Sequence, residues 1–198
     1  MQRSLSHGGI VATVVALSVF ASSSVLSLDK KSDAMRKMVE HGKYLVSVIG
    51  CGDCHSPKVF GPKGPSEDPS RLLSGSPASA HVPELPEGVL GPAKWGAICS
   101  NDFTIWSGPW GVSFTANLTP DVKTGLGSWN EDIFIKTIRT GKHMGEGRQI
   151  LPPMPWEGFS KMTDNDLKSI FAYLQTLKPI ENAVHEPIPP PGAEPPKK

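Results

Sequence analysis

The chain has 198 residues, of which 20 are basic and 19 acidic, so its formal net charge is +1 at pH 7. This near balance of charge gives no electrostatic basis for binding a polyanion, and we expect no nucleic acid among the partners. The length suits one globular domain after an N-terminal segment.

The first 28 residues have the pattern of a secretory signal peptide. Arg3 is the basic start, residues 10–20 form an apolar run, and residues 21–24 are small. We expect cleavage, with an uncleaved membrane anchor as the alternative because Gly9 to Leu28 is just long enough to span a bilayer. The sequence therefore predicts an exported, periplasmic protein, tethered to the membrane only if this segment is retained.

A first helix is expected from Ser32 or Asp33, either of which can cap it, to about Ile49. Its apolar face, at helical spacing, comprises Met35, Met38, Gly42, Leu45, Val46 and Ile49. A glycine within that face lowers helix propensity. We therefore favour close approach of another helix at Gly42 over a tolerated surface glycine.

Residues 51–55 read Cys-Gly-Asp-Cys-His, the attachment signature of a c-type haem. The two thiols, one helical turn apart, can each add to a haem vinyl group, and the adjacent imidazole then reaches the iron. A zinc site would need a fourth ligand, and a thioredoxin-like redox pair would need a strand-helix-strand context that is missing. The motif predicts one haem c, covalently bound through Cys51 and Cys54, with His55 as an iron ligand.

Residues 57–127 are rich in Pro and Gly and lack a sustained helical period. We expect at most short extended pieces, around residues 103–106 and 112–118. Three of the five tryptophans lie here, so the segment is expected to pack on something apolar, such as a haem edge. Cys99, the third cysteine, is expected to be a buried small hydrophobe, with an intermolecular disulfide as the alternative.

Two further helices and a tail complete the chain. Ser128 to Glu131 resembles a capping box, with Gly141 as the stop signal. Thr163 begins the clearest helix, whose apolar face comprises Leu167, Ile170, Phe171, Leu174 and Leu177. The proline-rich tail, 179–198, is expected to be extended or disordered, and we interpret it as an inert terminus rather than a docking arm.

The second axial ligand is expected to be Met154. It lies in Leu-Pro-Pro-Met-Pro-Trp, residues 151–156, where prolines stiffen the loop and so lower the entropy lost on ligation. Met144 and His143 are the alternative ligands, and a structural role is the alternative for Met154. Packing within or beside helices accounts for Met35, Met38 and Met162.

Several side chains near this loop are candidates for contacts with the haem periphery. Arg139, Lys142 and Arg148 are candidates for pairing with propionates, with a solvated charge as the alternative for each. Candidate hydrogen-bond donors, for which a core or turn role is at least as plausible, are Trp129, Trp156 and Asn117.

The order of these elements resembles the bacterial single-haem class I cytochromes c. Residues 108–121, residues 124–129 and the Met154 loop look like those of exported cytochromes associated with periplasmic dehydrogenases. The resemblance implies axial ligation by His55 and Met154, thioethers at both cysteines of the motif, and a crossing of the first and last helices near Gly42 and Tyr173.

The resemblance also implies a fold class, namely an all-α, cytochrome c-like fold of three main helices around one haem. The long Pro/Gly-rich loop insertion, residues 58–105, departs from the family pattern, as does the tail. We expect a signal peptide at 1–28, a cytochrome c domain at 29–178 and a Pro-rich tail at 179–198.

These features predict an electron-transfer protein rather than an enzyme. It would carry one electron at a time from a dehydrogenase to a cytochrome or an oxidase. A peroxidase-like enzyme with an open distal side is one alternative, with His143 and Glu146 as weak acid-base candidates. A gas-binding helical-bundle protein is another, but such bundles place the haem motif near the C-terminus.

Overall fold

The computed structural model describes residues 10–85 and 87–193, with side chains from Asp29 onward. The signal-peptide prediction for residues 1–28 therefore lies outside the described side chains. The chain divides into two compact units, residues up to Met38 and residues from Val39. Within the described part of the chain, none of the helices combines the length and the apolarity that a membrane crossing requires.

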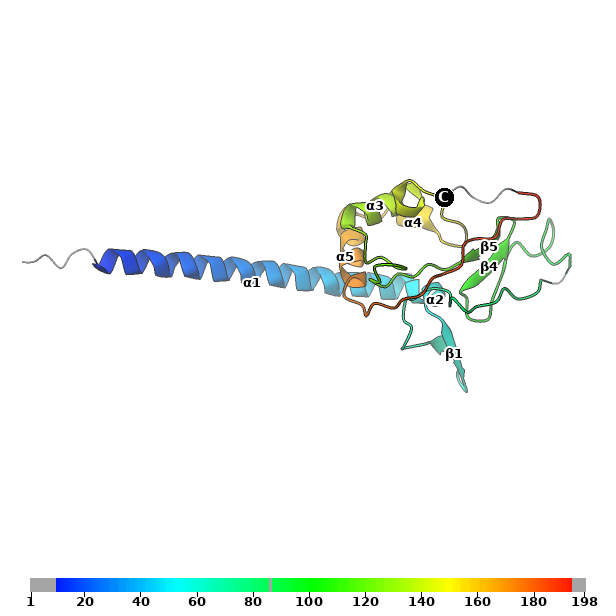
Figure 1. The fold of residues 1–198 in the computed structure, drawn as a ribbon, viewed down its shortest axis with the longest axis horizontal. Helices are drawn as coiled ribbons and strands as arrows, with labels where there is room; N and C mark the ends of the chain where they lie inside the picture. Colours follow the sequence, from blue (N-terminus) through cyan, green and yellow to red (C-terminus); the bar gives the residue numbers. More distant parts are fainter. Residues whose placement is uncertain (1–9, 86, 194–198) are drawn as a thin grey trace, which may run out of the picture. The chain divides into compact units, whose positions relative to one another are not determined.

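Helix α1 runs from Ile10 to Ile49 (Figure 1). It does not begin at Ser32 or Asp33, so the predicted N-terminal boundary is wrong. Asp33 instead pairs along the helix surface with Arg36 at 2.5 Å and Lys37 at 2.7 Å, at the spacing that such pairs need. Met35 is 52% exposed, which corrects its assignment to the packing face.

The last turns of α1 cross α5 at Gly42, within the second unit. A Cβ at residue 42 would lie 1.8 Å from the Ser169 carbonyl oxygen and 2.9 Å from the Tyr173 Cβ. Only a glycine allows this approach, which confirms both the interpretation of Gly42 and the implied crossing near Tyr173. Val46, one turn further on, is buried in the core.

Three of the helix boundaries follow from local features of the sequence, namely one glycine and two capping side chains. Gly50, at φ 76°, separates α1 from α2. Asn130, rather than Ser128, caps α3 by accepting a hydrogen bond from the Ile133 amide at 2.8 Å. Thr163 caps α5, as predicted. The bounds are Cys51–His55 for α2, Glu131–Thr140 for α3, His143–Gly145 for the short helix η1, Trp156–Phe159 for α4 and Asp164–Leu174 for α5.

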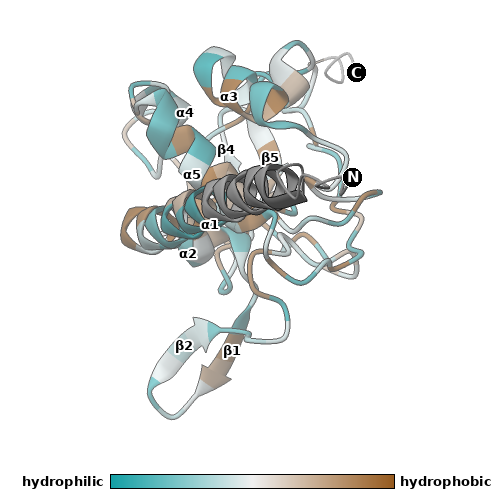
Figure 2. Ribbon diagram, turned by 90° about the vertical axis from the view of Figure 1, so that its left-hand side faces the viewer, coloured by the Kyte–Doolittle hydropathy of each residue, from teal (hydrophilic) through white to brown (hydrophobic). Residues whose placement is uncertain are grey.

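Two small antiparallel sheets make the purely all-α prediction wrong in part. One is the hairpin of β1, Lys58–Gly61, with β2, Gly64–Glu67, which projects from the helical body in Figures 1 and 2. The other has the order β3-β4-β5, with bounds Ile98–Cys99, Ile105–Gly108 and Gly111–Phe114. Both sheets form within the segment for which only short extended pieces were expected, because tight turns there bring neighbouring segments into register.

Cys99 is exposed, so the expectation of a buried thiol is wrong. It lies on β3, which is an edge strand of the second sheet and pairs only with β4. An edge strand at the surface leaves alternate side chains in solvent, and Ile98 is the partly buried residue of this pair.

The hydrophobic core lies between the three predicted helices. Its buried members are Val46, Leu73, Leu126, Phe134, Ile138, Leu167, Ile170 and Leu174. The Phe134 and Phe171 rings join α3 to α5 with their centroids 5.3 Å apart. Two core residues, Leu73 and Leu126, come from the Pro/Gly-rich segment, which therefore folds onto the helices.

The tail is extended, as expected, but it is not an inert terminus. Figure 1 shows the orange-to-red chain running from α5 toward β5. Ile188 exchanges both backbone hydrogen bonds with Val112 of β5, at 2.8 and 2.9 Å. Asn182 is 4% exposed and hydrogen-bonds to the carbonyls of Ser74 and Ser76. We call residues 180–188 the C-terminal strap.

Candidate haem site

Helix α2 presents all three residues of the attachment motif within one and a half turns. Cys51 and Cys54 are three residues apart, and residues at that spacing lie on the same side of a helix. The opposite side packs against the β1–β2 hairpin, because a Cβ at Gly52 would lie 1.7 Å from a Glu67 carboxylate oxygen. The glycine inside the motif therefore allows the hairpin to sit directly on α2.

A hydrogen bond to a backbone carbonyl fixes the ring of His55. Its Nδ1 lies 2.7 Å from the Ala116 carbonyl oxygen. A carbonyl oxygen only accepts hydrogen bonds, so Nδ1 carries the proton and Nε2 keeps its lone pair. Burial lowers the pKa of His55, which keeps the imidazole neutral, although the hydrogen bond to Ala116 opposes this effect. Ligating histidines in metalloproteins are commonly held in this way.

The two motif cysteines are neutral thiols in this environment. Burial raises the pKa of Cys51 to about 11 and also raises the pKa of Cys54, where the nearby Lys58 charge opposes it. A thiolate metal site needs the opposite shift. Over the described residues, no group of three or more His, Cys, Asp or Glu side chains is placed to hold a metal ion directly. The direction of the two pKa shifts weighs against a thiolate zinc site.

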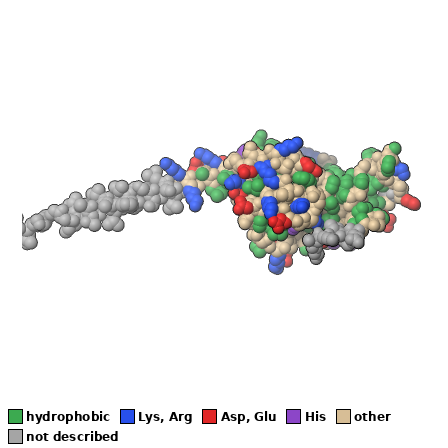
Figure 3. Space-filling view, turned by 90° about the horizontal axis from the view of Figure 1, so that it is seen from above, with side chains coloured by type: hydrophobic (Ala, Val, Ile, Leu, Met, Phe, Trp, Pro, Cys, Tyr) green, Lys and Arg blue, Asp and Glu red, His purple; other side chains and the backbone are tan. Residues whose placement is uncertain are grey.

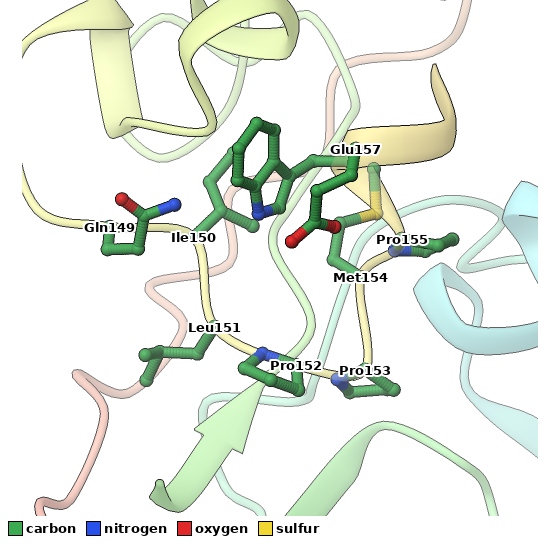
Figure 4. A pocket seen from close by; sticks show the side chains of 9 residues that line it. Gln149, Ile150, Leu151, Pro152, Pro153, Met154, Pro155 and Glu157 are labelled. Carbon is green, nitrogen blue, oxygen red and sulfur yellow. The ribbon is translucent and has the colours of Figure 1, made fainter. Parts of the chain in front are cut away.

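Met154 lies in a bent loop next to the same core that Cys51 contacts. Both side chains are partly buried and pack against the core cluster. Residues 149–157 line a cavity of about 340 Å³. Figure 4 shows the loop turning at Pro152 and Pro153, with the Met154 and Glu157 side chains within the bend. The loop thus presents a thioether close to the core surface that the attachment helix also covers.

Hydrogen bonds fix the Met154 loop at two points. The Ser113 hydroxyl donates to the Pro152 carbonyl at 2.6 Å and accepts from the Trp110 indole at 3.2 Å. The Ile150 amide donates to the Gly141 carbonyl at 2.7 Å. A loop held in this way loses little further entropy when its thioether binds a metal.

Sequence reasoning missed Ala116 and Ser113 as site residues. Both lie within residues 108–121, a segment that carries the family resemblance. That resemblance was the available signal, but a backbone carbonyl and a serine have no residue-type signature that would name them.

The alternative ligands for the iron are less well placed. Met144 is 45% exposed, on the short helix η1. His143 is exposed and lies edge-on to the Trp129 ring, with centroids 5.5 Å apart. Neither packs into the core cluster as Met154 does.

Three of the six candidates for contacts with the haem periphery have partners elsewhere. Arg139 donates to the Asp164 carboxylate at 2.5 Å, and Arg148 lies 3.7 Å from a carboxylate oxygen of Glu186. Asn117 is 3% exposed and donates to a carbonyl of the C-terminal strap at 2.8 Å. These contacts support the core or turn role that we gave as the alternative for Asn117.

Comparison with known proteins gives subunits of several dehydrogenases. The chain is 33% identical over 118 residues to the fructose dehydrogenase cytochrome subunit of Gluconobacter japonicus, covering 54% of the chain and 24% of the relative. It is 26% identical over 175 residues to the gluconate 2-dehydrogenase cytochrome c subunit of Pantoea cypripedii, and this alignment covers 88% of the chain and 30% of the relative. The alcohol dehydrogenase (quinone) cytochrome c subunit of Gluconobacter oxydans is 30% identical to the chain over 73 residues, and this alignment covers 36% of the chain and 15% of the relative.

The alignments cover less than a third of the length of each of these relatives. No family model matches the chain. The names of these relatives describe cytochrome subunits, which agrees with the prediction of an electron-transfer protein rather than a catalytic one. Together with the attachment motif and the His55 hydrogen bond, these relatives support the resemblance to c-type cytochromes associated with dehydrogenases.

Proposed function

We propose that the chain is a periplasmic one-electron carrier with a single covalent haem c. Cys51 and Cys54 would form the thioethers, and His55 and Met154 would be the axial ligands. The observation that carries this proposal is the His55 Nδ1 hydrogen bond to the Ala116 carbonyl, which leaves Nε2 available to iron. The donor set, one imidazole and one thioether, is the one that electron-carrier cytochromes use.

The bound haem would supply a ferric/ferrous couple, and the chain's own residues would keep their arrangement as the charge changes. The Ala116 carbonyl keeps the proton on Nδ1 of His55 in both oxidation states. The Ser113 and Gly141 hydrogen bonds hold the Met154 loop in place. Thioether ligation favours the ferrous form and so raises the reduction potential. A site that moves little on electron uptake suits a carrier.

A dehydrogenase is the proposed electron donor, and a cytochrome or an oxidase the acceptor. The names of the relatives support the donor, since they are cytochrome subunits of fructose, gluconate and alcohol dehydrogenases. Basic and acidic side chains are interspersed on the face in Figure 3, so docking would depend on local contacts rather than on one strong field. The N-terminal signal pattern supports export to the periplasm.

The test compares Met154→Ala with a matched control, Met144→Ala, whose side chain is largely exposed. Reduced-minus-oxidised spectra are recorded with and without carbon monoxide. We expect the wild type and Met144→Ala to bind carbon monoxide slowly or not at all. Met154→Ala should bind it rapidly and have a lower reduction potential, because its sixth position is open.

Two results would contradict the proposal. Rapid carbon monoxide binding by the wild type would favour the peroxidase-like or gas-binding alternative. An unchanged low-spin spectrum in Met154→Ala would reject this residue as the ligand, and a His143 variant would then be measured beside Met144→Ala.

A further inference from the structure

Lys58 folds its side chain back onto the haem-attachment helix. Its Nζ donates to the carbonyl oxygens of Gly52 at 3.0 Å, Asp53 at 2.9 Å and Ser56 at 2.5 Å. The last carbonyls of a helix lack partners within the helix, and an ammonium has three protons to donate. One side chain therefore contacts three acceptors around the turn that ends in His55, and of these the Gly52 carbonyl also accepts from the Ser56 amide at 3.1 Å.

Strand pairing also fixes the backbone of Lys58. The residue begins β1 and pairs in register with Glu67, whose carboxylate packs over Gly52. The Asp68 amide donates to the Pro57 carbonyl at 2.8 Å and closes the base of the hairpin. The hairpin thus fixes a positive charge against the attachment turn, where an ordinary surface lysine would move freely.

We propose that Lys58 is a positioning residue for the attachment turn and that its fixed charge raises the reduction potential of the proposed haem centre. The inference rests on the proposed function. Oxidation adds one positive charge to the centre, and a nearby cation makes that change less favourable. Removing Lys58 would also leave the carbonyl dipoles of Asp53 and Ser56 without the cation, and their negative ends favour the oxidised state. Both effects have the same sign.

If Lys58 only capped the helix, its removal would change the stability of the protein and not its reduction potential. A cation at a helix C-terminus contributes modestly to stability, and its loss would lower the melting temperature without changing the reduction potential. The potential therefore separates the two roles, because a purely structural contact would leave it unchanged.

The experiment measures midpoint potentials of the purified holoprotein by spectroelectrochemical titration. Lys58→Gln keeps a hydrogen-bond donor and removes the charge, Lys58→Met removes both, and Lys58→Arg keeps the charge. Lys63→Met, at the exposed tip of the same hairpin, is the matched control. We expect the ferrous-to-ferric ratio at a fixed ambient potential to fall about threefold to tenfold in Lys58→Gln and Lys58→Met. A tenfold change is about 59 mV for a one-electron couple.

Lys58→Arg should retain most of the wild-type potential, and Lys63→Met should leave it unchanged. An unchanged or higher potential in Lys58→Gln would overturn the proposal. So would a Lys58→Gln protein that lacks covalent haem while Lys58→Arg carries it, since Lys58 would then serve assembly alone. A wild-type protein without covalent haem would refute the proposed function itself, which is a distinguishable outcome.

Discussion

The substitution Asn182→Ala tests whether the C-terminal strap is part of the folded domain. Asn182 is 4% exposed, and its amide nitrogen donates to the carbonyls of Ser74 and Ser76 at 2.7 and 2.8 Å. Its oxygen accepts from the Ala78 amide at 2.9 Å and from Arg71 at 3.1 Å. The side chain therefore connects the strap to residues 74–78, whose Gly75 amide donates to the His55 carbonyl.

Alanine would leave two carbonyl oxygens and one amide near residues 74–78 without their hydrogen-bond partner. Arg71 would lose its bond to Asn182 as well, but its guanidinium can hydrogen-bond to water instead. At about 1 kcal/mol for each lost backbone partner, the free energy of unfolding should fall by about 3 kcal/mol. For a domain of this size the melting temperature should then fall by about 6–12 °C.

Thermal unfolding of the holoprotein, followed by circular dichroism, measures the change. Asn101→Ala, at an exposed position, is the control and should change the melting temperature by less than about 2 °C. A fall of less than about 2 °C in Asn182→Ala would refute the reasoning, because the strap would then contribute nothing that the solvent cannot replace.

Three further substitutions test separate contacts. Gly42→Ala should destabilise the protein by about 1–3 kcal/mol in urea unfolding, because the new Cβ would meet the Ser169 carbonyl. Gly158→Ala is the control and should not destabilise the protein, because the space around Gly158 is open; equal effects of the two substitutions would contradict the helix crossing. Hydrogen bonds from His41 and Thr163 lower the pKa of the Asp166 carboxyl below 3.8, so Asp166→Asn should be less stable than the wild type at neutral pH. The difference in stability should vanish as the pH falls well below 3.8, and a difference that persists in acid would contradict this assignment. Cys99→Ser should unfold as the wild type does under reducing conditions, because the thiol is exposed, and a loss above about 1 kcal/mol would mean that it is packed.

Local patterns in the sequence predicted the helical frame. The Thr163 cap and the apolar period predicted α5 and its first residue, because periodicity and capping are properties of neighbouring residues. The predicted apolar face extended to Leu177, whereas α5 ends at Leu174. Gly42 predicted a helix crossing, since a glycine within an apolar helix face weakens the helix unless a second backbone packs against it. The motif itself placed Cys51, Cys54 and His55 on one short helix.

Contacts between distant segments could not be predicted in the same way. Asn182 is a single polar residue in a proline-rich tail, and nothing in its neighbours indicates that it binds carbonyls more than 100 residues away. The partner of His55 is a backbone carbonyl at Ala116, and any residue type supplies such a group. The sheet of β3, β4 and β5 likewise depends on tertiary pairing more than on local propensity.

Mass spectrometry of the purified protein tests the central claim most directly. We predict an intact mass that exceeds the chain by one haem, and a haem-bearing peptide in which both Cys51 and Cys54 are thioether-linked. Substitution of both cysteines by serine should abolish the adduct, while Cys99→Ser should retain it. A protein isolated from a haem-attaching host that carries no covalent haem, or carries it at other residues, would contradict the account.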